Sequence, residues 1–356
     1  MTSLLSWLAV AAVTVVAFGL LIVIHELGHY LAARLFGMRV DRFSVGFGPV
    51  VWSRRRGDTE WAISAVPLGG YVKIAGMAPG EDGAREDPRA YCNQAAWRRF
   101  LVILAGPAAN YVLAVLLAVG LIATMGLREP DPAPVVGELV PGGPAERSGL
   151  RPGDRIVSAG GAPVDTWVAL VQAVRTHPGV DLPLEVRRAG VPAGAATVVV
   201  VVRPDDAGGI GRVGMAPNLV ATRAGLAEAA AIGFRRTNEK ASEILSGLGQ
   251  VLARKQRAEL RGPVGIAEEM ARSARAGTAP FLMMVWLISI MLALFNFLPL
   301  PALDGGRLVF LAYEIVTRRP VNQKVEGIVH LAGFVALLGL LLAVTVFGDL
   351  ARLLRH

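Results

Sequence analysis

Residues 4–29 read LLSWLAVAAVTVVAFGLLIVIHELGH. Residues 4–24 carry no charged side chain, and as a helix they would extend roughly 30 Å, the thickness of a bilayer core. We therefore expect a membrane-spanning helix over 4–33. In the HELGH motif, His25 and His29 would share one helix face and could hold one zinc ion, with Glu26 free to act as a base. Ionisable groups at membrane depth are costly, so this placement indicates a functional motif.

The composition predicts a multi-pass α-helical membrane protein. Of its 356 residues, 53% are hydrophobic and only 18% are charged, with a mean hydropathy of +0.50. Further apolar blocks at 100–127, 279–303 and 328–348 bring the expected transmembrane helices to four, and His330 is the one titratable group in the last block. Met1 to Trp7 lacks Lys and Arg, so the first block is not a secretory signal peptide.

Basic residues indicate the orientation. They are concentrated between the first two helices (Arg34, Arg39, Arg42, Arg54, Arg55, Arg56, Lys73, Arg85, Arg89, Arg98, Arg99) and before the fourth (Arg307, Arg318, Arg319, Lys324). Both segments should be cytoplasmic, which puts 128–278 and both termini outside and HELGH on the cytoplasmic side. Much of the net charge of +8 then lies in the cytoplasmic loops, next to anionic lipid. We therefore expect no nucleic-acid partner. Cys92 is the only cysteine, which excludes a disulfide framework and a cysteine zinc site.

The segments between the helices differ in pattern. Residues 43–74 alternate like a β-hairpin turning at Gly57-Asp58, which would be either an ordinary cytoplasmic hairpin or a sheet edge that pairs with an extended peptide. Residues 222–275 predict a polar, amphipathic helical segment along the outer membrane surface, broken at 262–265.

Residues 133–205 form a separate soluble α+β unit. We expect strands at 134–140, 182–188 and 197–203 and a helix at 166–176, and the valine-rich run at 197–202 suggests a strand buried on both faces. The composition, with SGLRPGDRI at 148–156, resembles a bacterial PDZ domain, a class that usually binds peptide C-termini by strand addition. The alternative is a spacer that binds nothing.

A catalytic zinc site needs a third protein ligand. Among the remaining histidines, His177 is in the expected outer domain and His356 is at the C-terminus, so neither should reach the cytoplasmic end of the first helix. His330 is expected at the membrane interface. Asp304 follows the third apolar block at the depth of HELGH, although it could simply end a helix in an Asp-Gly turn. Pro299 and Pro301 break that helix just before it. Two amides, Asn296 and, after Gly106-Pro107, Asn110, could satisfy or polarise a peptide backbone.

These motifs together resemble the site-2 protease family of intramembrane zinc metalloproteases. HELGH, GPAAN (106–110) and NFLPLPALDGG (296–306) fall on three separate helices, and FSVGFGP (43–49), PLGGYVKIAGM (67–77) and the PDZ-like insert are similar to the bacterial branch that includes the regulator of sigma-E protease. That protease carries two tandem PDZ domains, whereas this chain has room for one.

The resemblance implies one Zn²⁺ held by His25, His29 and Asp304, Glu26 as general base, and hairpin 43–74 binding the unwound substrate as an added strand. It further implies that Asn296 contacts the substrate, and we include Asn110, Gly46, Gly48, Gly69 and Gly70 among the predicted substrate-binding residues. The family fold is a bacterial inner-membrane protein of four transmembrane helices, a membrane-associated β-hairpin and an extracytoplasmic PDZ-like domain.

The expected function is regulated intramembrane proteolysis of single-pass membrane proteins, such as anti-sigma-factor-like proteins or remnant signal peptides. The PDZ-like domain would bind a peptide C-terminus or exclude substrates with bulky outer domains. Two alternatives remain: a membrane metalloprotease that cuts in the cytoplasm, and a PDZ-presenting scaffold or zinc-binding protein without proteolysis. The base in HELGH, Glu26, disfavours the scaffold, because a scaffold needs no base.

Overall fold

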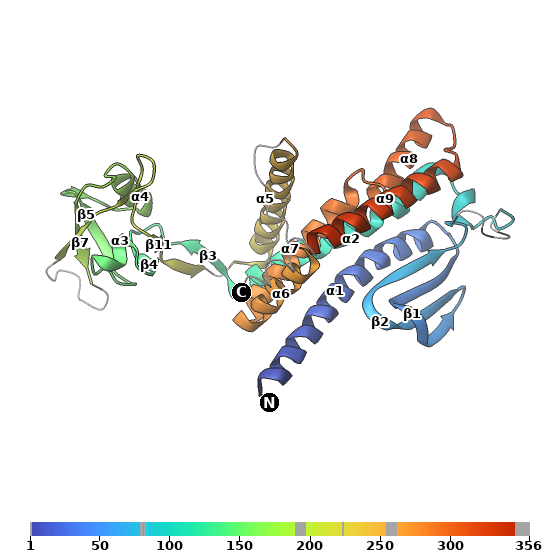
Figure 1. Cartoon of the computed structure of the whole chain (residues 1–356), viewed down its shortest axis with the longest axis horizontal. Helices are drawn as coiled ribbons and strands as arrows, with labels where there is room; N and C mark the ends of the chain where they lie inside the picture. The colour runs from blue at the N-terminus through green and yellow to red at the C-terminus, as the bar shows by residue number, and fades with distance from the viewer. Residues whose placement is uncertain are drawn as a thin grey trace. The chain divides into compact units, whose positions relative to one another are not determined.

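The computed structural model describes residues 2–78, 81, 83, 85–188, 197–222, 224–253 and 262–345. The chain forms two compact units (Figure 1). The membrane unit comprises Met1–Leu121 and Leu226–His356, and the inserted domain comprises Ile122–Gly225. The inserted domain is therefore wider than the predicted 133–205.

Among the described residues of the membrane unit, four helices are long and apolar enough to cross a bilayer: α1 (Thr2–Leu35), α2 (Ala96–Met125), α7 (Thr278–Phe297) and α9 (Gln323–Ala343). They correspond to the four predicted spans. In contrast to the prediction of 279–303, α7 ends at Phe297, because Pro299 and Pro301 cannot continue the backbone hydrogen bonding. Residues 346–348 of the predicted fourth span lie outside the described residues.

A helix that was not predicted from the sequence, α8 (Asp304–Thr317), follows the break. The segment was expected to be a short connection because it is amphipathic and has basic residues within it and directly after it, Arg307, Arg318 and Arg319. An ion pair of 2.5 Å between Arg99 and Glu314, both largely buried, joins α8 to the start of α2. Leu308 and Leu311 of α8 pack in one core with Ala33, Val102 and Ile103.

At the centre of the membrane unit, α1 packs closely against α2 and α7. Gly28 of α1 lies against α2, where an added Cβ would come within 2.2 Å of the Ala105 carbonyl oxygen. Leu21 of α1 packs in a second core with Val285 and Ile288 of α7. The helix that carries HELGH is therefore held by both α2 and α7.

The predicted hairpin is present, as β1 (Val40–Arg56) and β2 (Thr59–Ile74). Both strands are bent, so the two form a sheet with more than two rows: residues 42–45 pair with 70–73 and also with 60–63. Gly46, with φ +89°, allows the bend, and a Cβ there would come within 2.7 Å of the Val66 carbonyl oxygen. β2 runs beside α1 (Figure 1).

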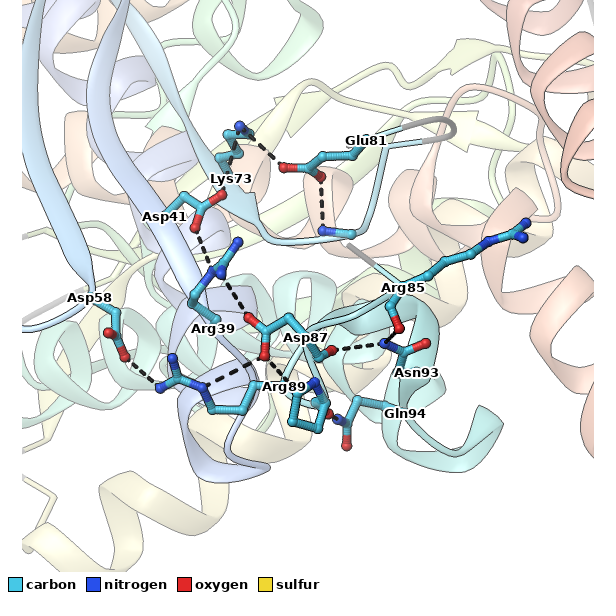
Figure 2. Close-up of polar contacts among 12 residues, drawn as sticks. Arg39, Asp41, Asp58, Lys73, Glu81, Arg85, Asp87, Arg89, Asn93 and Gln94 are labelled. Atoms are coloured by element: carbon cyan, nitrogen blue, oxygen red, sulfur yellow. Dashed lines mark hydrogen bonds and ion pairs between the residues drawn. The ribbon is translucent and has the colours of Figure 1, made fainter. Parts of the chain in front are cut away.

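Ion pairs connect the ends of β1 and β2, and the turn between these strands, to the segment that leads through η1 (Tyr91–Asn93) into α2. Figure 2 shows Arg39 between Asp41 and Asp87, with its guanidinium 2.7 Å from the Asp87 carboxylate. Arg89 reaches Asp58 at 2.8 Å, and Lys73 lies 3.3 Å from Glu81. Exposed pairs contribute about 0–1 kcal/mol each, so the backbone bonds Arg39 N–H to Arg89 O and Tyr91 N–H to Ala75 O matter at least as much.

The predicted segment 222–275 forms two helices, α5 (Leu226–Leu252) and α6 (Pro263–Ala276), and the second begins within the predicted break at 262–265. Both pack against the spanning helices. Asn238 of α5 accepts a hydrogen bond from Tyr111 of α2 at 2.8 Å, and Met270 of α6 is fully buried with Leu21. The expected place of α5 and α6 along the outer membrane surface stays a prediction.

The inserted domain is built around a four-stranded antiparallel sheet in the order β6-β5-β7-β8. Its elements are β3 (Leu127–Pro130), β4 (Val136–Leu139), α3 (Pro144–Arg147), β5 (Arg155–Ala159), β6 (Ala162–Pro163), α4 (Trp167–Arg175), β7 (Leu182–Arg187), β8 (Val198–Val202), β9 (Asp205–Asp206), β10 (Gly211–Arg212), β11 (Met215–Pro217) and β12 (Leu219–Thr222). Leu170 and Val174 of α4 cover the sheet in its core.

The expected burial of β8 on both faces is wrong. Val200 and Val202 are buried, but Val198, Val199 and Val201 are 45–60% exposed. β8 is an edge strand of a sheet that is covered on one face, so Val199 and Val201 face solvent, and Val198 is exposed at the start of the strand.

Candidate zinc centre and active site

The helical spacing of HELGH brings His25 and His29 together. Both imidazoles are buried, and their Nε2 atoms lie 3.2 Å apart. Asp304, the first residue of α8, approaches from the break after α7. Its Oδ2 lies 2.9 Å from His25 Nε2 and 3.4 Å from His29 Nε2. Two histidines four residues apart and an aspartate more than 270 residues later thus converge on one point.

The spacing of these three atoms fits a tetrahedral zinc ion. Ligand atoms held about 2.0–2.1 Å from such an ion lie roughly 3.3–3.4 Å from one another. Asp304 Oδ2 is buried and makes no hydrogen bond of acceptable geometry with the described residues, although both imidazoles are close. A buried carboxylate oxygen in this state indicates a cation between the three groups.

The second nitrogen of His29 supports the same assignment. His29 Nδ1 donates to the carbonyl oxygen of Val102 on α2, at 2.8 Å. With the proton on Nδ1, the Nε2 lone pair points at the other two ligand candidates, as metal-binding histidines require.

Gly106 of α2 leaves room for an ion. A Cβ at this position would lie 2.3 Å from His29 Nε2 and 2.8 Å from His25 Nε2. The sequence drew attention to Gly106 only as part of the GPAAN motif at 106–110. Its position beside two adjacent histidines could not be found without the packing of α1 on α2.

Asn110 lies in the same wall of the site. Its Nδ2 is 3.4 Å from His25 Nδ1, and its Oδ1 is buried without a hydrogen-bond partner among the described residues. A half turn of the amide would place the acceptor oxygen opposite the Nδ1–H that a zinc-binding His25 must carry. Ser289 of α7 holds the Asn110 backbone by donating to its carbonyl oxygen at 2.8 Å.

Glu26 of α1 reaches the sheet that packs against this helix. Its Oε2 accepts a hydrogen bond of 3.0 Å from the backbone N–H of Val72 in β2. The strand segment 70–74 therefore lies beside the motif, with residues 40–45 paired on its other side.

The remaining predicted site residues have backbone conformations or contacts that the local fold requires. Gly46, Gly48 and Gly69 have positive φ values, and a Cβ on Gly70 would lie 2.6 Å from the Ser44 carbonyl oxygen. Asn296, in the last turn of α7, donates to the Leu292 carbonyl oxygen at 3.0 Å. Their contact with substrate stays a prediction.

These features define a class: a multi-pass membrane protein with an HExxH centre completed by a distant carboxylate. The chain belongs to peptidase family M50, whose model matches residues 13–340. It is similar to the zinc metalloprotease RasP of Geobacillus kaustophilus (31% identical over 95% of this chain and 97% of that one) and to the putative zinc metalloprotease all3971 of Nostoc (36%; 93% and 92%). It is also similar to the regulator of sigma-E protease RseP of Escherichia coli (29%; 98% and 100%).

The family identifies the chain as an intramembrane zinc metalloprotease of the inner membrane, with zinc as cofactor. The predicted family resemblance, enzyme class and cofactor are thereby confirmed. The alternative of a scaffold without proteolysis is not supported.

Proposed function

We propose that His25, His29 and Asp304 are the zinc ligands and that Glu26 is the general base of peptide-bond hydrolysis. The observation that carries this proposal is the convergence of Asp304 Oδ2 and the two Nε2 atoms within 3.4 Å of one another. When bound, zinc supplies a Lewis acid that polarises the scissile carbonyl and makes water acidic enough to lose a proton near neutral pH.

Groups of the protein transfer the proton and orient the reacting side chains. Glu26 takes the proton from the attacking water and passes it to the leaving amine nitrogen. Val102 and Asn110 keep the histidine rings oriented. The Val72 N–H orients the Glu26 carboxylate before the reaction.

A transmembrane substrate must unwind before it is cut, because its peptide bonds are hidden in helical hydrogen bonds. We propose that the unwound segment pairs with the edge of β2 at residues 69–72, next to Glu26. Added-strand pairing would satisfy the freed backbone groups. The substrates proposed are single-pass membrane segments, such as those of anti-sigma-factor-like proteins or remnant signal peptides.

We further propose that the inserted domain is PDZ-like and extracytoplasmic. A groove of about 700 Å³ between α4 and β10–β11 supports peptide binding, since it is lined by Trp167, Val171, Val174 and Met215 with Arg175 and Arg212. Apolar side chains would accept the last residues of a chain, and a guanidinium its carboxylate.

Asp304→Asn with metal analysis tests the ligand set. The full-length variant should lose bound zinc and proteolysis together while it remains folded, because an amide is a poor zinc ligand. Asp165→Asn, at an exposed position of the inserted domain, is the matched control. Retention of stoichiometric zinc by Asp304→Asn would refute the proposed set.

A further inference from the structure

The segment 298–303, which we call the Asp304 loop, connects α7 to α8 and sets the position of Asp304. Ala302 has φ +74°, a left-handed conformation that alanine rarely adopts and that neighbouring contacts must maintain. Leu303, the residue before α8, provides no side-chain cap. The loop therefore needs support from elsewhere in the protein.

The first turn of α8 supplies one side of that support. A Cβ on Gly305 would lie 1.8 Å from the Leu298 carbonyl oxygen, and one on Gly306 would lie 2.6 Å from that of Leu300. The loop thus folds back onto the two glycines that follow Asp304, and a shift of the loop would move Asp304 as well.

The other side is supplied by α9. The imidazole of His330 accepts a hydrogen bond at Nδ1 from the Ala302 N–H, at 3.1 Å. Three residues later, Gly333 lets α9 touch the loop, where a Cβ would lie 2.2 Å from Pro301 Cβ. Phe310 of α8 lies beside the imidazole, with ring centroids 6.0 Å apart.

His330 is the one titratable residue of the predicted span 328–348. Its helix is apolar, and its large neighbours Leu331, Phe334 and Val335 are all more than half exposed, as expected of side chains that face lipid. An imidazole in such a helix is costly unless it makes a specific bond. Because Nδ1 accepts a hydrogen bond, the neutral ring carries its proton on Nε2.

We propose that His330 is a positioning residue: by accepting the Ala302 N–H it holds the Asp304 loop in its left-handed turn and so fixes the third zinc ligand. This inference rests on the proposed role of Asp304. Its first consequence is slow hydrogen exchange of the loop backbone, and this does not depend on zinc.

The test compares His330→Leu with His330→Asn in full-length, detergent-solubilised protein. Asparagine offers an acceptor oxygen close to the position of Nδ1, whereas leucine offers none. Two quantities are measured: hydrogen exchange of the peptide covering 298–303 in zinc-free protein, and zinc affinity by competition with a chelator. For His330→Leu we expect faster exchange and a zinc affinity lower by roughly 10–100-fold. For His330→Asn both quantities should stay close to those of the unaltered protein.

Glycine variants provide a second measurement. Gly333→Ala should push α9 from the loop and lower zinc affinity, whereas Gly339→Ala on the same helix, with open space around it, should not. Unchanged exchange in His330→Leu would overturn the proposal, as would equal losses in His330→Leu and His330→Asn. If Asp304→Asn keeps its zinc, the ligand assignment fails, and loop exchange still reports whether His330 holds the loop.

Discussion

The backbone N–H of Val72 donates a hydrogen bond to the Glu26 carboxylate at 3.0 Å, which joins the sheet edge to the base of the HELGH motif. The strand proposed to receive the substrate thus also orients the group proposed to activate water. A peptide that pairs with this edge would lie within reach of both. The same contact determines how a Glu26 variant should behave.

Glu26→Gln should abolish proteolysis and leave zinc content unchanged. The amide oxygen of glutamine can still accept the Val72 N–H, so the motif keeps its geometry, but the amide cannot take a proton. Loss of a general base typically lowers the rate by about 10²–10⁴-fold. Cleavage of a model transmembrane substrate and zinc content by mass spectrometry check this. Cleavage at the native rate would contradict the assignment.

Gly106→Ala should empty the zinc site. The added methyl group would lie 2.3 Å from His29 Nε2, in the space where the proposed ligands meet. Gly120→Ala is the control on the same helix, since no other group lies within 4 Å of its Cβ. Both variants raise helix propensity by about 1 kcal/mol, so only local crowding distinguishes them. If both bind zinc equally, the centre does not lie against α2.

Asn110→Leu should weaken zinc binding by roughly 10–100-fold, because the Nδ1–H of His25 loses its acceptor. Asn110→Asp keeps an acceptor oxygen of the same size and should bind zinc better than the leucine variant. Chelator competition measures both. Equal zinc affinity in the two variants would show that Asn110 does not orient His25, and would leave its predicted role as a substrate contact.

The sequence predicted the spanning helices, the hairpin and the proximity of His25, His29 and Asp304, because each follows from local composition or from a motif whose membrane depth the basic residues indicate. It did not predict α8, nor the roles of Gly106, Val102 and His330. Those roles arise from contacts between helices far apart in the chain, and no periodicity encodes which face of α2 or α9 meets α1 or the Asp304 loop. β8 shows the same limit, since five identical valines cannot reveal which of them face solvent.

Membrane topology is testable with single cysteines. In a Cys92→Ser background, Val180→Cys in the inserted domain should react with an impermeant maleimide in spheroplasts, because we propose that this domain is extracytoplasmic. Arg55→Cys in the sheet should react only after the membrane is opened. Both parent residues are exposed, so burial does not limit labelling. The reverse pattern would invert the orientation drawn from the basic residues.

Removal of the inserted domain tests whether it restricts access. The β3–β12 pair and the bond from the Asp131 N–H to the Asn218 carbonyl oxygen give a natural junction, so residues 132–217 can be replaced by a two-residue Asn-Gly turn. If the domain excludes bulky substrates, the shortened protein should cut membrane proteins that still carry their outer domains, which the full-length protein leaves intact.

A groove variant separates exclusion from peptide binding. Val171→Arg fills the apolar groove of the intact domain and should prevent binding of a peptide C-terminus, as measured by fluorescence anisotropy. If exclusion depends only on the bulk of the domain, this variant should keep the selectivity of the native protein while the deletion loses it. If both variants cut untrimmed substrates, selectivity depends on the groove itself. Unchanged selectivity in the deletion would show that the domain does not restrict access, because its physical obstruction would then have been removed without effect.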